Sequence, residues 1–393
     1  MNKIIYLSTK YLSETDFERA GIYKYLKNKI NVEIWYLNKL VAKYYNNKEF
    51  RFKKLIIKKI SNFEQFENEL KKNSFNCIYD LRVAYYFQNK KIFQTLSKYN
   101  INYIVHIRGD IHKHKISLKN FIKKIIKGNF THLKLIFFNL FFLLFSSNFW
   151  NIRKAKYACF IGKYGYLKRE KHKLIDNQTR FIMGQHRDYD DYLKINSKTL
   201  NTKNKKVLFI DSAIPYHPDS KYNIGSSSDV NPEEYYSSIK FFLEKLRKSF
   251  DYKIEISCHP RIEIKKLKKH FPNFVIKRKE TINQIRYSKL IITHDSNAIN
   301  FAVLYKKPII FITNDSLKKS FIHYNYQINK MAKLFNKRSI NIDSNSIIDI
   351  TKQLKINKRV YKNFLNNFIK ANGTKKFQAD IITERLKKDK IWV

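Results

Sequence analysis

The sequence predicts an α/β protein built from two domains with parallel sheets, and three observations lead to this class. The chain has 393 residues, and a single hydrophobic core stops growing at roughly 250 to 300 residues. Strand and helix patterns alternate over residues 1–110, and a second alternation begins at residue 205. Strands that are separated by helices form parallel βαβ units, so each half is expected to be a doubly wound, Rossmann-like domain.

The first alternation is expected to place a helix between its first two strands. Residues 14–29 have the amphipathic pattern and acidic first turn of a helix. Strands are expected at 3–9, 31–37, 75–81 and 102–110.

The second alternation contains the clearest helix start in the chain. Asn231 is the expected N-cap, Pro232 takes the first helical position, and Glu233 and Glu234 complement the helix dipole. This helix is expected to continue to residue 250. Strands are expected at 205–214, 252–260, 273–279, 289–296 and 307–313.

The polar stretch 191–204, rich in Asn, Lys and Ser, is the expected linker between the halves. It divides the chain into an N-terminal Rossmann-like domain over 1–190 and a C-terminal Rossmann-like domain over 205–370. Residues 371–393 are expected to form a last helix.

Residues 116–150 interrupt the first domain with an apolar and basic insertion. The run from Leu135 to Phe145 is almost wholly apolar but shorter than the roughly 20 residues that span a bilayer. Lysines precede it, and Trp150 and Arg153 follow it. We interpret the insertion as an interfacial anchor on the anionic inner face of the cytoplasmic membrane; the alternative is a buried helical hairpin.

The chain is strongly basic, with a formal net charge of +47. Such a surface attracts polyanions: nucleic acid, anionic lipid or phosphorylated substrates. The basic residues are spread along the chain, and no zinc-finger, RRM or helix-turn-helix signature is present, so we expect no nucleic-acid partner. Cys77, Cys159 and Cys258 lack metal-ligand spacing and are expected to be buried free thiols. With no signal-peptide pattern at the start, we expect a cytoplasmic protein.

Polar groups gather where predicted strands end, which is where open α/β sheets bind ligands. His259, in the segment ISCHPR, ends one strand. After another strand, Ser296 precedes an apolar helix, and small polar groups at a helix start favour an anion. The expected nucleotide- and phosphate-binding residues are His259, Pro260, Arg261, His294, Ser296 and Asn297.

This combination resembles the nucleotide-binding domain of GT-B glycosyltransferases, whose two domains face a central cleft. The resemblance rests on a His-Pro turn, a Ser-containing strand-to-helix turn, and an apolar helix followed by Lys307 and Pro308 before the next strand. It covers residues 206–312 and is strongest to bacterial sialyl- and Kdo-type transferases, which use CMP-activated nonulosonic acids. The family pattern implies that His259 contacts the donor phosphate and assists the departing nucleotide, and that Ser296 bonds the same phosphate.

One departure from the wider family bears on the donor. Many transferases that use UDP- or GDP-sugars hold the ribose with a Glu, and counting back from Pro308 that position is Phe301 here. The resemblance therefore favours a CMP donor, with a UDP- or GDP-sugar transferase as the alternative.

The segment after residue 210 is expected to line the donor and acceptor cleft that the resemblance implies. It includes a second His-Pro pair, at His217, which competes with His259 for the motif; we prefer His259 because it follows a strand. The expected cleft residues are Asp211, Tyr216, His217, Asp219, Gly225 and Ser226.

An inverting transfer needs a base that takes the acceptor hydroxyl proton. The resemblance places it in the N-terminal domain, where Asp110 is the preferred candidate and Asp80 the alternative. The cluster Asp188, Asp190 and Asp191 lacks a preceding apolar strand, so we expect no metal and no other cofactor.

Together these features predict a glycosyltransferase of capsule or lipopolysaccharide biosynthesis that acts with inversion. Its expected partners are a nucleotide-sugar donor, a glycan or lipid-linked acceptor and the inner membrane surface. A basic nucleic-acid-binding protein is the less favoured alternative.

Overall fold

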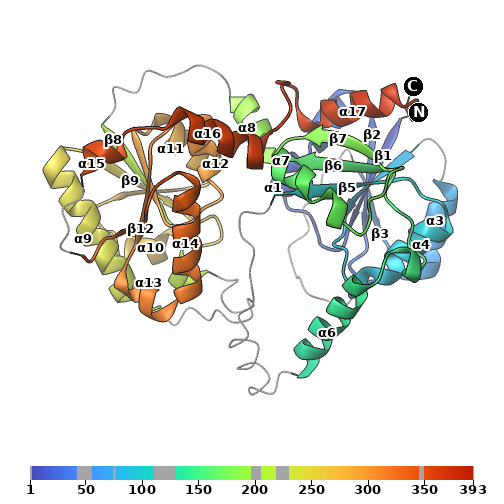
Figure 1. Ribbon diagram of the computed structural model, residues 1–393, viewed down its shortest axis with the longest axis horizontal. Helices are drawn as coiled ribbons and strands as arrows, with labels where there is room; N and C mark the ends of the chain where they lie inside the picture. The colour runs from blue at the N-terminus through green and yellow to red at the C-terminus, as the bar shows by residue number, and fades with distance from the viewer. Residues whose placement is uncertain are drawn as a thin grey trace. The chain divides into compact units, whose positions relative to one another are not determined.

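The computed structural model describes residues 2–41, 55–73, 77–109, 130–195, 205–217, 230–344 and 349–392. The described residues divide into two compact units (Figure 1). Unit 1 draws its residues from 1–110, 122–193 and 366–393, and unit 2 from 194–365.

Unit 1 is built on a seven-stranded sheet in the order β3-β2-β1-β4-β5-β6-β7. Its neighbouring strands pair in parallel. The strand order reverses between β1 and β4, and ligands bind open α/β sheets at such a switch point. The strands are β1 (Lys3–Ser8), β2 (Asn31–Tyr36), β3 (Ile56–Lys59), β4 (Cys77–Arg82), β5 (Tyr103–Arg108), β6 (Tyr157–Ile161) and β7 (Arg180–Gly184).

Helices cover both faces of this sheet. Side chains of α3, α4 and α6 enter the core on one face, and those of α1, α2 and α17 enter the core on the other. The helices are α1 (Glu14–Arg19), α2 (Ile22–Lys27), α3 (Phe63–Lys72), α4 (Lys90–Lys98), α6 (Phe130–Leu144), α7 (Gly162–Leu167), α8 (Arg187–Ile195) and α17 (Gln378–Lys388). Short helical turns lie at η1 (Phe87–Asn89), η2 (Asn148–Trp150), η3 (Arg169–Lys171) and η6 (Leu365–Ile369).

Two local features of unit 1 differ from the sequence expectation. The single helix expected over 14–29 is two short helices, because Gly21 takes a left-handed conformation with φ of 75° between them. The expected linker overlaps α8, whose last residues are 191–195; residues 196–204 lie outside the described part of the chain.

The C-terminal helix α17 is part of the core of unit 1. Ala379, Ile382 and Leu386 on this helix, and Trp392 after it, are buried beside Ile4 and Tyr157. The first and last parts of the chain therefore fold together.

Unit 2 is built on a six-stranded parallel sheet in the order β10-β9-β8-β11-β12-β13, with its switch point between β8 and β11. The strands are β8 (Lys206–Ile210), β9 (Lys253–Cys258), β10 (Val275–Arg278), β11 (Leu290–Thr293), β12 (Ile309–Thr313) and β13 (Ile340–Asn341). The helices are η4 (Ile214–Tyr216), α9 (Pro232–Phe250), α10 (Ile264–Lys268), α11 (Thr281–Tyr287), α12 (Ile299–Leu304), α13 (Asp315–Ser320), α14 (Ile322–Leu334), α15 (Ile350–Gln353) and α16 (Lys358–Phe364).

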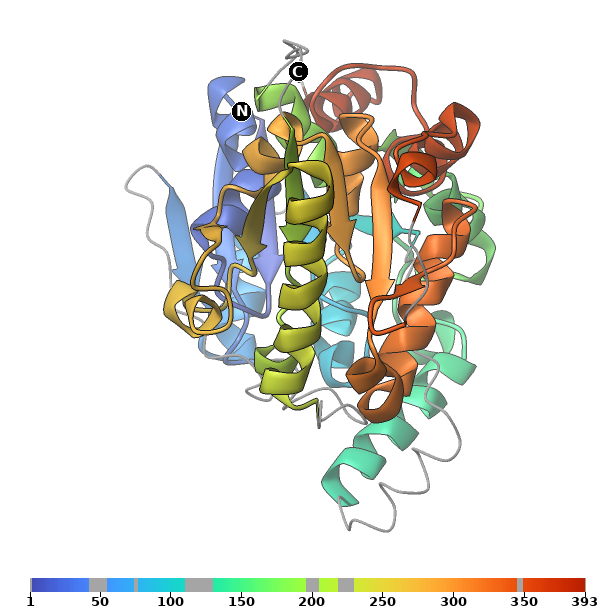
Figure 2. The same ribbon diagram turned by 90° about the vertical axis from the view of Figure 1, so that its left-hand side faces the viewer.

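Helix α9 begins where its capping residues predict. The Asn231 side chain accepts hydrogen bonds from the backbone N–H groups of Glu233, at 2.9 Å, and Glu234, at 3.4 Å. In Figure 2 this long yellow-green helix lies along one face of the sheet of unit 2, with Tyr235, Tyr236 and Leu243 among its buried side chains. The predicted fold class, two α/β domains with parallel sheets, is confirmed.

Candidate functional site

The carboxyl edge of the unit 2 sheet brings together the histidines of the two His-Pro pairs, His217 and His259. His217 follows η4 after β8, and His259 follows β9, which is the neighbour of β8. Their ring centroids are 4.7 Å apart with an interplanar angle of 63°. Both residues are partly exposed, so two accessible imidazoles from separate strands lie at the carboxyl edge of one sheet, the edge where open α/β sheets bind ligands.

A backbone contact fixes how the imidazole of His259 presents its proton. The backbone N–H of Arg261 donates to Nδ1 of His259, at 3.3 Å. In the neutral ring this leaves the proton on Nε2, which is then a hydrogen-bond donor. Pro260 and Arg261 are exposed at the same turn.

Of the three residues after β11 that the sequence grouped as phosphate-binding, two are accessible and one is buried. Ser296 and Asn297 are accessible, and the Ser296 hydroxyl accepts from the backbone N–H of Ala298, at 3.2 Å. The hydroxyl keeps its own proton for donation to another acceptor. Helix α12 has only six residues, so side chains and local N–H groups, more than a helix dipole, define this turn.

His294 in contrast lies inside the unit. Its side chain is fully buried, and Nδ1 donates to the carbonyl oxygen of Ile312, at 2.7 Å. Burial lowers the pKa of His294 to about 4, so the ring is neutral at pH 7. The predicted phosphate-binding role of His294 is not favoured by this geometry, because the side chain is buried and Nδ1 is already bonded to Ile312.

Asp211 lies at the switch point of unit 2, just after β8. Its side chain is buried, and Oδ1 accepts from the backbone N–H of Ala213, at 2.9 Å. Burial raises its pKa to about 7, against the opposing effects of that hydrogen bond and of the Tyr236 hydroxyl. The Tyr216 hydroxyl is hydrogen-bonded to Nε2 of His270, at 2.8 Å.

The loops after β8 and β11 meet across the switch point. The Ser212 hydroxyl lies 3.5 Å from the carbonyl oxygen of Asp295, and the Tyr324 hydroxyl donates to the same oxygen at 3.2 Å. The turn that carries Ser296 is therefore held against the loop that leads to His217. Of the expected site residues, Asp110, Asp219, Gly225 and Ser226 lie outside the described residues.

In unit 1 the end of β4 carries a buried ionic cluster. Asp80 is fully buried, with Oδ1 2.8 Å from Nε of Arg82 and Oδ2 3.0 Å from Nε2 of His106. Burial raises the pKa of Asp80, but its interactions with Arg82 and His106 outweigh burial and the pKa lies below its ordinary value. A carboxylate that is enclosed and paired in this way is a poor candidate for direct proton transfer to a substrate.

The same cluster reveals a residue that the sequence analysis did not select. His106 is on β5, two residues before its end, and its side chain is 9% exposed. Because Asp80 is ionised, Nε2 of His106 carries the proton, and Nδ1 has no hydrogen-bond partner among the described residues. A histidine inside the apolar strand YIVHIR is the signal that could have drawn attention to it.

Two carboxylates of the acidic cluster after β7 are buried in unit 1. Asp188 and Asp190 are buried in α8, and Asp190 accepts from the Gln185 side chain and from the backbone N–H of Gln378. Among the described residues no group of three or more His, Cys, Asp or Glu side chains is placed to hold a metal ion.

No protein-family model and no curated protein sequence matches this chain. Solved structures are similar along most of its length at low identity. A variant of the wall teichoic acid polymerase TagF is 13% identical with a TM-score of 0.49, covering 99% of this chain and 89% of that chain. The UDP-GlcNAc 2-epimerase of Methanocaldococcus jannaschii is 15% identical with a TM-score of 0.43, covering 99% and 100%. MurG of Acinetobacter baumannii is 8% identical with a TM-score of 0.39, covering 93% and 91%.

Proposed function

We propose that this protein is a glycosyltransferase that takes a sugar from a nucleotide donor and adds it to a glycan or lipid-linked acceptor of the cell surface. The observation that supports this most is the pairing of His217 and His259 at the carboxyl edge of unit 2. The crevice of a doubly wound sheet is where phosphorylated ligands bind. The resemblance of the His-Pro and serine turns to those of GT-B transferases points to the same activity.

The side chains at this edge supply hydrogen-bond donors for a phosphate that departs as the leaving group. In the proposed inverting transfer, the acceptor oxygen attacks the anomeric carbon, and the bond from that carbon to the phosphate oxygen breaks. Its electron pair stays on the phosphate. His259 donates through Nε2–H, Ser296 through its hydroxyl and Arg261 through its guanidinium, and such donors stabilise the charge that develops.

The donor is proposed to be CMP-linked, with a nonulosonic acid as the sugar. Phe301, at the position where many UDP- and GDP-sugar enzymes hold the ribose with Glu, is an apolar side chain only 6% exposed. It cannot bond a ribose hydroxyl. The alternative, a UDP- or GDP-sugar, requires that other residues hold the ribose.

We propose that His106, oriented by Asp80, takes the proton of the acceptor hydroxyl. Burial lowers the pKa of His106 below its ordinary value, although Asp80 opposes this, so the ring is neutral near pH 7. The bond from Nε2 to Asp80 leaves the lone pair on Nδ1, as a general base needs. Asp110 remains the prediction from sequence.

Titration with nucleotides while thermal unfolding is followed tests the donor class. A ligand that binds the folded state raises the unfolding temperature by mass action. Saturable stabilisation by CMP alone supports the nonulosonic donor, and stabilisation by UDP or GDP alone supports the alternative. If none of the three stabilises the protein, the nucleotide site is wrong.

A further inference from the structure

Helix α6 and the turn after it expose a continuous apolar surface on unit 1. Phe137 is 65% exposed and Leu144 is 75% exposed, although a water-soluble helix normally turns such side chains inward. Both views show α6 extending beyond the rest of unit 1 (Figures 1 and 2). We call this surface the apolar ridge; it consists of Phe137, Leu140, Phe141, Leu143, Leu144 and Phe149.

The ridge is held in place by specific contacts on its other side. Phe142 is fully buried in the core of unit 1. Asn139 accepts from the backbone N–H of Phe87 at 2.8 Å, and the indole N–H of Trp150 donates to the carbonyl oxygen of Phe142 at 3.1 Å. The helix is thus docked through one face, while its other faces present Phe and Leu to the surroundings.

Cations surround the ridge, and acids are absent from its sequence. No Asp or Glu occurs between residues 111 and 169. The ammonium of Lys90 lies 4.7 Å from the Trp150 ring centroid, that of Lys134 lies 6.0 Å from the Phe138 ring, and that of Lys173 approaches the last carbonyl of α6. An apolar surface with a positive border fits the charge of an anionic bilayer.

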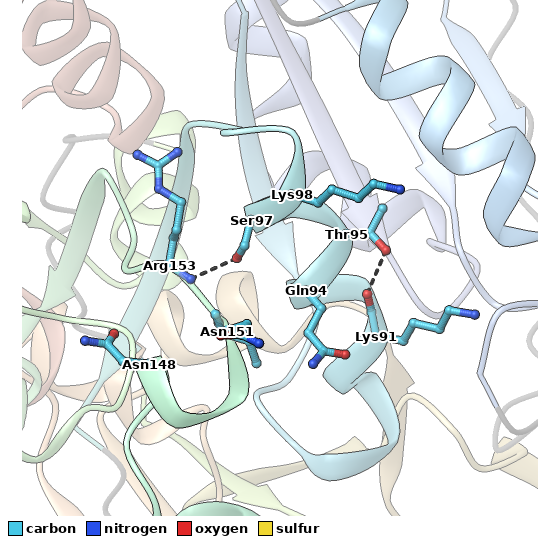
Figure 3. Close-up of a pocket in the computed structure, with 9 residues that line it drawn as sticks. Lys91, Gln94, Thr95, Ser97, Lys98, Asn148, Asn151 and Arg153 are labelled. Atoms are coloured by element: carbon cyan, nitrogen blue, oxygen red, sulfur yellow. Dashed lines mark hydrogen bonds between the residues drawn. The ribbon is translucent and has the colours of Figure 1, made fainter.

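A basic surface pocket of about 630 Å³ lies directly beside the ridge. Figure 3 shows its lining from α4 on one side and from the segment after α6 on the other. The Gln94 side chain donates to the carbonyl oxygen of Trp150, at 2.9 Å, which joins the pocket to the residue that follows Phe149 of the ridge. Among the described residues Lys91 and Arg153 have no carboxylate partner. The pocket is lined by Lys91, Gln94, Thr95, Ser97, Lys98, Asn148, Asn151, Ile152 and Arg153.

We propose that the apolar ridge inserts into one leaflet of a lipid bilayer and that the adjacent pocket takes the headgroup phosphate of an anionic phospholipid. An interfacial helix buries its apolar side chains about 5 to 10 Å deep, at the boundary between headgroups and acyl chains, so cations at its edge lie at the level of the phosphates. At 15 residues α6 is too short to cross a bilayer, and no described helix is long and apolar enough to do so. This proposal stands independently of the reaction that the protein catalyses.

Vesicle flotation tests the proposal on the full-length protein. The probes are vesicles of phosphatidylcholine alone and vesicles with about 30 mol% phosphatidylglycerol, which carries the anionic phosphate. We expect the protein to float with the anionic vesicles. Phe137→Ser with Leu144→Ser is expected to weaken binding to both vesicles by at least about tenfold. Lys91→Ala with Arg153→Ala is expected to remove mainly the preference for phosphatidylglycerol, by about fivefold for each cation.

Matched control variants on unit 2 distinguish binding through the ridge and pocket from non-specific binding of any exposed apolar or basic side chain. Phe241, 69% exposed on α9, serves as the control for the ridge, and Phe241→Ser is expected to leave binding unchanged. Lys245→Ala with Arg338→Ala is the charge control for the pocket. Thermal unfolding of each variant verifies that it is folded.

Three results would overturn the proposal. The first is that the wild-type protein does not float with anionic vesicles. The second is that the control variants weaken binding as much as the ridge and pocket variants do. The third is that sedimentation without lipid shows self-association, that Phe137→Ser abolishes this self-association, and that vesicle binding is absent. That last result would assign the ridge to a second copy of the chain.

Discussion

The imidazoles of His217 and His259 lie 4.7 Å apart between centroids, although they follow different strands of unit 2. Because β8 and β9 are neighbours in a parallel sheet, the two histidines that compete in the sequence form one pair. We therefore propose the pair, and not His259 alone as the sequence predicts, as the phosphate contact.

Substituting either histidine of this pair is expected to impair transfer while the fold survives. Removing one donor from a developing negative charge costs about 10²- to 10³-fold in kcat, and we expect this for His259→Ala, with a smaller loss for His217→Ala. Steady-state kinetics with the donor that stabilises the protein measures the effect. His172→Ala is the matched control, because His172 Nδ1 also accepts a backbone N–H at 3.3 Å but lies in unit 1. Full activity in His259→Ala would remove His259 from the site.

The pH profile of kcat is expected to report the pair of Asp80 and His106. A general base must be deprotonated, so activity is expected to fall as the pH drops through the pKa of His106, which lies below its ordinary value. Asp80 raises the pKa of His106. Asp80→Asn is therefore expected to shift the acidic limb to lower pH and to lower kcat, because the ring loses its orienting carboxylate.

His106→Gln keeps a polar side chain of similar size but supplies no base. We expect it to lose kcat by about 10²-fold or more with little change in KM. An unchanged acidic limb in this variant would show that another group, such as Asp110, is the base.

The sequence predicts the parts of this fold that local patterns encode. Helix α9 begins at its Asn231 cap, and apolar runs mark β1, β8 and β12, because capping and alternation depend on adjacent residues. It does not predict β13, which has two residues and is defined only by pairing with β12.

In the candidate site, too, local patterns are predictable from the sequence and long-range contacts are not. The polar residues at strand ends could be selected from the sequence, but their neighbours depend on strand order. The contact of His217 with His259 requires that β8 lies beside β9, and the contact of Asp80 with His106 requires that β4 lies beside β5. Such pairings join residues far apart in the chain, and no local pattern specifies them.

Asp211→Asn is expected to stabilise the protein at neutral and alkaline pH. Burial raises the pKa of Asp211 from 3.8 to about 7, so the folded state holds its proton more tightly than the unfolded state. The stability from this group is full below pH 3.8 and is lost as the pH rises to about 7. A shift of this size corresponds to up to about 4 kcal/mol. Thermal unfolding of both proteins at pH 5 and pH 8 should show the larger advantage for the variant at the higher pH, and an equal difference at both would contradict the raised pKa.

Helix α17 is expected to be essential to the stability of unit 1. Leu386 is fully buried in its core, and truncating such a side chain costs about 2 to 5 kcal/mol. Urea unfolding of Leu386→Ala measures the loss, with the exposed neighbour Lys387→Ala as the control. Equal stability of the two variants would show that α17 does not belong to this core.

Calorimetric titration of the donor nucleotide into the wild-type protein and into His217→Ala, His259→Ala and His172→Ala tests the central claim most directly. The proposed site predicts saturable binding of one nucleotide to the wild type and to His172→Ala, and binding weakened by at least about tenfold in both variants of the histidine pair. Nucleotide binding of equal strength in all four proteins would contradict a phosphate site at His217 and His259.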